Sequence, residues 1–322
     1  MSEKRRTIRN VQTSPKRPSK PSPSVIDWPS RWTTMQLGGK MACSAETLLF
    51  DRFTCNASGA IFYGGKPLTR EEGQSRRIEE GAFGDVAVET TADNAVQVIV
   101  KRYNGNPDQS DVFSVMKRGI EIATSLKECD LVRFVAFERG TSSRPKLITV
   151  MEKLNGDVRI VQKMWKARLF DVERPNPVHL ALVQKFARFL ADVDDCLGEN
   201  AFTDMKLENV GFCGAPGRDD FQYRMIDIDS INAPMGTYLI SDDPAVSAKD
   251  NATYAFGCTL AAFCMGENWD DNGYFVMPDA RNKVVQWFKK IKADLELHGI
   301  DDFGIFDRAA STIVRHVAGL DE

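Results

Sequence analysis

The sequence predicts an α+β fold in which a β-rich part is followed by a mostly α-helical part, with the boundary near Leu154. Before this residue, short runs of β-branched and aromatic residues alternate with turn residues, which is typical of strands joined by tight turns. After Asn155-Gly156, apolar residues recur every three or four positions over long segments, which is typical of helices that pack on a core. At 322 residues, the chain is long enough to form two modest domains with a sizeable core.

The individual elements follow from the same patterns. The strand-like runs share β-branched residues, and the first two are separated by an Ala-Asp-Asn turn; they cover residues 85–91, 95–103, 131–140 and 146–154. The helical segments share apolar residues at helical spacing, and they cover residues 110–128, 175–197, 253–265 and 281–299.

Two segments precede this pattern. In residues 27–77, the pairs Gly38-Gly39 and Gly64-Gly65 indicate turns between short strands or within a strand–helix piece, but no function can be assigned to this N-terminal extension. Residues 1–26 are rich in proline, lysine and arginine, and we expect them to be a disordered tail. The tail fits either a solvated segment or a basic arm that binds a nuclear-import receptor or a polyanion.

Composition excludes several classes of protein. The net charge is −3 although the tail is basic, so the rest of the chain is acidic and nucleic-acid binding by the folded part is not favoured. No apolar run is long enough to span a membrane, and the first residues lack the apolar region of a secretory signal. Seven cysteines without a CxxC pair argue against disulfides and zinc. We therefore expect an intracellular protein of a reducing compartment, cytoplasmic or nuclear.

A possible phosphate-binding turn lies between two strand-like runs. Gly81 and Gly84, with the small Ala82 and then Phe83 between them, would let a hairpin backbone approach a phosphate closely. The alternative is an ordinary hairpin turn. Seventeen residues after Gly84, the run Val-Ile-Val places Lys101 in the next strand, where an ammonium group can act as a fixed charge for phosphate oxygens.

Polar residues with catalytic chemistry follow the strong helix at residues 175–197. Asp204, Lys206 and Asn209 are spaced so that a carboxylate, an ammonium group and an amide oxygen can converge on one centre. Eighteen residues beyond Asn209, Asp227 ends an apolar run, where it can ligate Mg²⁺. Asp229 is a second candidate for that ligand, and the sequence alone leaves the choice open.

These four motifs, in this order, resemble those of the protein kinase superfamily over about residues 78–322. IEEGAFGDV is similar to the glycine-rich loop G-x-G-x-x-G-x-V, with Glu79 in place of the first glycine. VIVK is similar to V-A-I-K, FTDMKLEN to H-R-D-x-K-x-x-N, and MIDID stands where the family has the metal-binding aspartate. Lys206, two residues after Asp204, matches the serine/threonine protein kinases and argues against the small-molecule kinases.

The resemblance implies a bilobal protein-kinase-like fold and an ATP-dependent serine/threonine protein kinase that requires Mg²⁺. The β-rich N-lobe would cover residues 78–153, and the mostly α-helical C-lobe residues 154–322. The compact C-lobe and the basic tail resemble those of large-DNA-virus kinases. Protein substrates would carry serine or threonine acceptors.

The resemblance also implies a role for each motif residue. Lys101 would contact the α- and β-phosphates under the glycine-rich loop, to which Val86 also belongs. Asn209 and Asp227 would hold Mg²⁺. Asp204 would orient the substrate hydroxyl, and Lys206 would neutralise the γ-phosphoryl group during transfer.

Further positions are implied by their place in the chain. Glu121 resembles the helix glutamate that pairs with the strand lysine. Met151 would be the gatekeeper, and the backbone from Glu152 to Leu154 would meet adenine. Asp157 is either a ribose contact or a plain turn residue.

The chain departs from the family at several positions. Phe202-Thr203 replaces His-Arg before Asp204, which removes the arginine that receives an activation-loop phosphate and predicts activity without that phosphorylation. No A-P-E sequence is visible, and Ala252 replaces the usual aspartate five residues before Gly257. A literal Asp-Phe-Gly at residues 302–304 lies too far along the chain to be the metal motif. These departures keep two alternatives open, a pseudokinase scaffold without catalysis and a small-molecule kinase.

Overall fold

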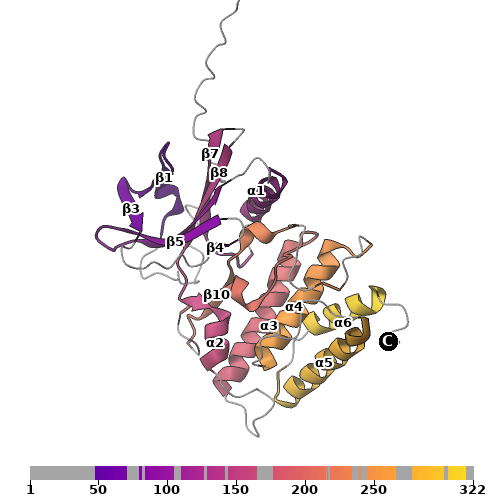
Figure 1. Cartoon of the computed structure of the whole chain (residues 1–322). Helices are drawn as coiled ribbons and strands as arrows, with labels where there is room; N and C mark the ends of the chain where they lie inside the picture. The colour runs from indigo at the N-terminus through magenta and orange to yellow at the C-terminus, as the bar shows by residue number, and fades with distance from the viewer. Residues whose placement is uncertain are drawn as a thin grey trace, which may run out of the picture.

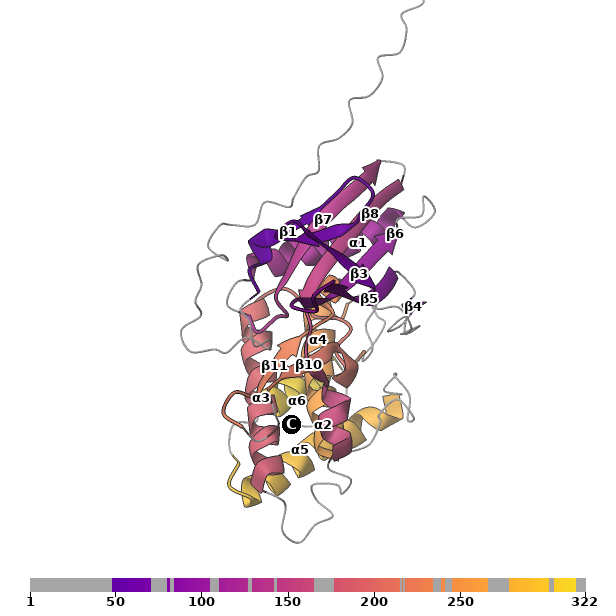
Figure 2. The same ribbon diagram turned by 90° about the vertical axis from the view of Figure 1, so that its left-hand side faces the viewer.

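The protein is a mixed α+β molecule, seen in the computed structural model of Figure 1. The structure describes residues 48–70, 80–81, 84–104, 110–126, 129–141, 144–164, 177–214, 216, 218–233, 239–240, 245–265, 278–300 and 304–316. The expected tail at residues 1–26 lies outside the described residues, as do Ala82, Phe83 and parts of the N-terminal extension. Two views show strands β1–β8 and helix α1 at one end of the molecule and helices α2–α6 at the other (Figures 1 and 2).

The β-rich part is built on one large antiparallel sheet with the strand order β1-β2-β3-β5-β6-β8-β7, and β4 pairs with β5. Its strands are β1 (Phe53–Cys55), β2 (Ile61–Tyr63), β3 (Lys66–Arg70), β4 (Glu80–Gly81), β5 (Gly84–Thr91), β6 (Gln97–Asn104), β7 (Phe134–Thr141) and β8 (Arg144–Glu152). The predicted hairpin is confirmed, because β5 and β6 pair in register with Val86 opposite Lys101. At its turn Asn94 has a φ of 54°, a conformation that asparagine tolerates better than most residues.

The described part of the N-terminal extension, residues 48–70, supplies strands β1–β3 of this sheet and packs on one face of β6, β7 and β8. Its apolar side chains form a core separate from the main one, with side chains of β6, β7 and β8. Ile61 is fully buried there. The edge strand β1 also reaches β7, because Arg139 donates hydrogen bonds to the backbone oxygen and the sulfur of Cys55. The expected turn at Gly64-Gly65 is present, since both residues have positive φ.

The second face of the sheet packs on helix α1 (Ser110–Ser125), which ends three residues earlier than predicted. Among the described residues, the helical part contains five further helices and a small sheet of β9, β10 and β11. The bounds are α2 (Val158–Met164), α3 (Pro177–Leu197), α4 (Ala248–Met265), α5 (Pro278–Leu297), α6 (Gly304–His316), β9 (Gly156–Asp157), β10 (Val210–Cys213) and β11 (Gln222–Met225). No helix in the described ranges is long and apolar enough to cross a membrane.

Helix α4 runs through the core of the helical part. Phe263 of α4 packs on Phe186 of α3, with ring centroids 4.7 Å apart. Gly257 lets α6 approach on another face, because a Cβ at this position would lie 2.5 Å from the Cβ of Ala309. The helix is apolar on nearly every side, which explains why its residues are buried from Ala252 to Cys264.

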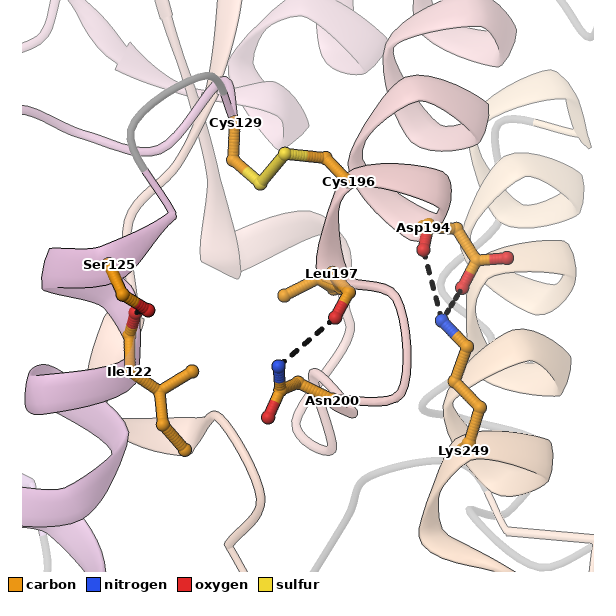
Figure 3. The surroundings of a disulfide bond; sticks show 8 residues. All are labelled: Ile122, Ser125, Cys129, Asp194, Cys196, Leu197, Asn200 and Lys249. Atoms are coloured by element: carbon orange, nitrogen blue, oxygen red, sulfur yellow. Dashed lines mark hydrogen bonds and ion pairs between the residues drawn. A yellow bond between two sulfur atoms is a disulfide. The ribbon is translucent and has the colours of Figure 1, made fainter.

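A disulfide joins Cys129, in the segment after α1, to Cys196 in the last turn of α3 (Figure 3). The expectation that the cysteines form no disulfide is therefore wrong, and the cysteines no longer indicate a reducing compartment. The two cysteines are 67 residues apart, so no short sequence motif connects them. Beside this bond, Lys249 of α4 pairs with Asp194 of α3, with Nζ 2.8 Å from Oδ1.

Candidate functional site

The candidate site lies where β6 meets the segment that follows β11. Lys101, in the middle of β6, has a side chain that is 17% exposed. Its Nζ lies 2.8 Å from Oδ1 of Asp227 and 2.9 and 3.0 Å from the two carboxylate oxygens of Asp229. The structure thus brings together two predicted site residues, Lys101 and Asp227, that are 126 positions apart in the sequence.

The electrostatics of this cluster keep Lys101 protonated. Burial alone would lower the pKa of Lys101, but nearby Tyr103, Asp227 and Asp229 outweigh it, and the pKa is raised well above its ordinary value. The ring of Tyr103 lies 5.1 Å from Nζ, within the range of a cation–π contact. Burial and the charge of Asp229 raise the pKa of Asp227. Two carboxylates therefore share one ammonium group.

The loop at residues 201–209 supplies the second group of polar side chains. Asn209 donates from Nδ2 to the backbone oxygen of Asp204 at 2.6 Å and to its Oδ2 at 2.9 Å. Nζ of Lys206 lies 3.0 Å from the same Oδ2. The predicted convergence of Asp204, Lys206 and Asn209 is confirmed. The 3-10 turn Leu207–Asn209 brings Asn209 back towards Asp204. Burial would lower the pKa of Lys206, but the charge of Asp204 outweighs it and raises the pKa.

Backbone pairing ties this loop to the residues after Asp227. Phe202 forms an isolated antiparallel bridge with Ile231. Thr203 donates from Oγ1 to the backbone oxygen of Ser230 at 2.8 Å. The amide of Ile226 donates to the backbone oxygen of Asn209 at 3.0 Å, which holds Asn209 and Asp227 in adjacent segments. The loop and the metal-ligand candidates therefore form one connected unit.

The residues proposed to hold Mg²⁺ fit that ion by chemistry. Asn209 uses its amide nitrogen for both hydrogen bonds to Asp204, so its Oδ1 is the atom that can ligate a cation. The Asp227 side chain is 28% exposed, against 10% for Asp229. Amide and carboxylate oxygens are hard ligands of the kind that Mg²⁺ prefers.

Glu121 does not occupy its predicted place beside Lys101. The side chain is exposed on α1, whereas the described ion pairs of Lys101 are with Asp227 and Asp229. The reason is helical geometry. Gly119, two residues earlier, faces residues 228–231, and a step of two residues turns about 200° around the axis to the opposite side. The prediction that Glu121 pairs with the strand lysine is therefore corrected.

The residues expected to contact adenine lie at the end of β8 and just beyond it. Met151 and Glu152 are buried, and the Glu152 carboxylate binds Arg133, with Nε 2.8 Å from Oε2. Leu154 lies against Gly211 of β10, because a Cβ at Gly211 would come within 2.3 Å of Leu154 Cδ1. The side chain of Glu152 is thus committed to Arg133, and its amide donates to the backbone oxygen of Arg133 at 2.9 Å.

Asp157 is a helix cap in this structure. Its Oδ1 accepts a hydrogen bond from the amide of Arg159 at 2.9 Å, at the start of α2. The Arg159 guanidinium binds Asp157 again and also binds Glu208, with Nη1 2.9 Å from Oε1. Of the two alternatives for Asp157, a ribose contact or a turn residue, these contacts favour the turn residue.

Gly81 and Gly84 face each other in the β4–β5 pair. The predicted turn residues between them, Ala82 and Phe83, lie outside the described residues, and Val86 follows in β5 next to Lys101 on the neighbouring strand.

Sequence reasoning missed the contact between Asp229 and Lys101 and the contact of Arg159 with Glu208. The repeat Asp-Ile-Asp at residues 227–229 was a signal for the first, because two acids so close to an apolar strand need a cation.

A scan against protein-family models and a search of curated proteins found no match to this chain.

Proposed function

We propose that this protein is an Mg²⁺-dependent serine/threonine protein kinase with a bilobal kinase-like fold. The observation that carries the proposal is the convergence of Lys101, Asp204, Lys206, Asn209 and Asp227 from three distant segments. The sequence resemblance assigns each of these residues a part in phosphoryl transfer, and their contacts agree with those parts.

In the proposed reaction, the bond between the γ-phosphorus of ATP and its bridging oxygen breaks, and a new bond forms to a serine or threonine hydroxyl of a protein substrate. Asp204 accepts the hydroxyl proton, and ADP leaves with the electron pair of the broken bond. Lys206, 3.0 Å from Asp204, is placed to neutralise the phosphoryl group in transfer. Lys101, held protonated, supplies a fixed positive charge for the α- and β-phosphates.

Asn209 and Asp227 would hold Mg²⁺, which shields the negative charge of the phosphates when it is bound. The amide of Ile226 donates to the backbone oxygen of Asn209, so the segments that carry the two residues are held side by side. This supports a catalytic part for both residues.

The test is phosphate transfer from γ-labelled ATP, with Mg²⁺ and generic acceptor proteins, by the purified wild-type chain and by Asp204→Asn. This variant keeps the shape of the side chain and removes the proton acceptor. Label that appears on serine and threonine with the wild type and is lost with the variant supports the proposal. Nucleotide binding without transfer would instead indicate a scaffold, and transfer only to small hydroxyl compounds would indicate a small-molecule kinase.

A further inference from the structure

We propose that Asp229 is the residue that positions Lys101 for phosphate binding, the part that the sequence resemblance gives to Glu121. The inference rests on the proposed function and extends it by a positioning residue. It also separates the two candidate metal ligands, because it gives Asp229 to the lysine and leaves Asp227 for the cation.

The contacts of the two carboxylates with Lys101 differ. Asp229 engages Nζ with both oxygens, at 2.9 and 3.0 Å, and its side chain is only 10% exposed. Asp227 engages Nζ through Oδ1 at 2.8 Å, and its side chain is 28% exposed. A buried carboxylate with both oxygens on one ammonium group is a fixed anchor. A more exposed carboxylate with a single contact is better placed to ligate a cation.

The packing of α1 explains why the anchor comes from residue 229. A Cβ at Gly119 would lie 2.9 Å from the backbone oxygen of Asp229 and 3.0 Å from that of Ile231. Only glycine permits this approach, so the 3-10 turn Ile228–Ser230 seats directly on the helix. The same contact fixes the rotation of α1 and leaves Glu121 on its exposed side.

The turn itself is held at both ends, so the position of Asp229 is defined before any nucleotide binds. Ser230 Oγ donates to the backbone oxygen of Asp227 at 2.8 Å, and the backbone oxygen of Ser230 accepts from Thr203. The ring of Tyr103 lies in the same cluster, 5.1 Å from Nζ of Lys101. Lys101 is thus held by a carboxylate that belongs to the same turn as the metal-ligand candidate.

The kinetic test compares Asp229→Asn with Glu121→Gln, two changes that each remove one negative charge and keep the side-chain shape. We expect Asp229→Asn to lower kcat on the order of 10²-fold, because the ammonium group loses its anchor. The KM for ATP should change less than about threefold, as expected for an interaction used in the transition state. Glu121→Gln should leave both constants within about twofold of the wild type. A large loss in Glu121→Gln with little change in Asp229→Asn would overturn the inference.

Magnesium dependence separates a positioning residue from a metal ligand. In Asp229→Asn, the Mg²⁺ concentration that gives half-maximal rate should stay within about twofold of the wild-type value, whereas Asp227→Asn should raise it on the order of tenfold or more. A rise in Asp229→Asn as large as that in Asp227→Asn would show that Asp229 is the ligand and would also overturn the inference.

A melting experiment needs no catalysis and therefore separates this inference from the proposed function. In Lys101→Met, Asp227 and Asp229 face each other without the cation, and the chain should melt at a lower temperature. Adding Asp229→Asn removes one of the two charges and should raise the melting temperature by about 2–4 °C over the single variant. Adding Glu121→Gln instead should leave it unchanged. No rise in the first double variant, or an equal rise in the second, contradicts the inference even if wild-type phosphate transfer fails.

Discussion

Asn209 combines two tasks in one side chain. Its amide nitrogen fixes Asp204 through two hydrogen bonds, which leaves its carbonyl oxygen for a cation. Asp204 has a different task in the proposed reaction, since it accepts a proton and touches no metal. Substitutions at these two positions should therefore differ in their dependence on Mg²⁺ although the side chains are in contact.

We expect Asn209→Ala to lower the maximal rate and to raise the Mg²⁺ concentration needed for half-maximal rate on the order of tenfold. Asp204→Asn should lower the rate by about 10²–10⁴-fold and leave the Mg²⁺ requirement close to that of the wild type. Initial rates measured across a Mg²⁺ titration for the two variants test this. Equal Mg²⁺ requirements in both variants would show that Asn209 is no ligand.

At the scale of elements, two links join helices that are distant in the sequence. The disulfide connects the segment after α1 to α3 (Figure 3), and Asp250 in the first turn of α4 binds Arg315 and His316 in the last turn of α6. The disulfide restricts the unfolded chain as well as the folded one. The Asp250 ion pairs instead act in the folded protein, where they change the pKa of Asp250.

Opening the disulfide should destabilise the protein without altering its fold. A cross-link between positions 67 residues apart lowers the entropy of the unfolded chain, and its loss should cost about 2–4 kcal/mol of unfolding free energy. The measurement is denaturant unfolding of the wild type with and without dithiothreitol, beside Cys129→Ser/Cys196→Ser. Because Cys213 is also disulfide-bonded, the double variant should show this loss without reductant and should lose less stability than the wild type when dithiothreitol is added. A reductant effect of the same size in the double variant would assign the loss to something other than this bond.

Asp250 should make stability depend on acid pH. Burial alone would raise the pKa of Asp250, but hydrogen bonds from His316 and Ser247 and the charge of Arg315 outweigh it, so the pKa is lowered below 3.8. A carboxyl with a lowered folded-state pKa stabilises the protein above its unfolded pKa, and that contribution disappears as the pH falls from about 3.8 through the folded-state value. Asp250→Asn should melt below the wild type at pH 7, and the difference should shrink towards pH 3. A constant difference would contradict this.

At the scale of the whole molecule, local chemistry was more predictable than long-range contacts. The β5–β6 hairpin and the grouping of Asp204, Lys206 and Asn209 follow from patterns within short windows of sequence. The partner of Lys101 could not be predicted in this way, because it depends on how Gly119 lets α1 rotate against a segment more than a hundred residues away. The disulfide and the packing of residues 48–70 were missed for the same reason.

The N-terminal extension should be required for a stable sheet although it contains no motif residue. Ile61 is fully buried in the core that residues 48–70 form with β6, β7 and β8. Ile61→Ala should therefore cost about 2–5 kcal/mol of unfolding free energy. Because Lys101 lies in β6, nucleotide binding should weaken at temperatures where this variant begins to melt. Thr54→Ala, at an exposed position of the same hairpin, is the control and should cost less than about 0.5 kcal/mol. Equal stability of the two variants would show that this core contributes little.

The assembled site predicts an enzyme that needs no activating phosphate. In kinases with an arginine before the catalytic aspartate, phosphate on the activation segment pairs with that cation. Here Thr203 occupies the position, and its hydroxyl donates instead to Ser230, which ties the loop at residues 201–209 to the turn that carries Asp227. This connection is an uncharged hydrogen bond that forms without phosphorylation, so a phosphate has no cation to bind at position 203.

Phosphatase-treated protein should keep most of its transfer activity, and Ser247→Ala should lower the rate less than about tenfold, or about 1.4 kcal/mol of barrier. Thr203→Val, which keeps the shape and removes the hydrogen bond, should lower both melting temperature and rate. A phosphatase-treated enzyme whose activity returns only after incubation with ATP would show that phosphorylation switches it on.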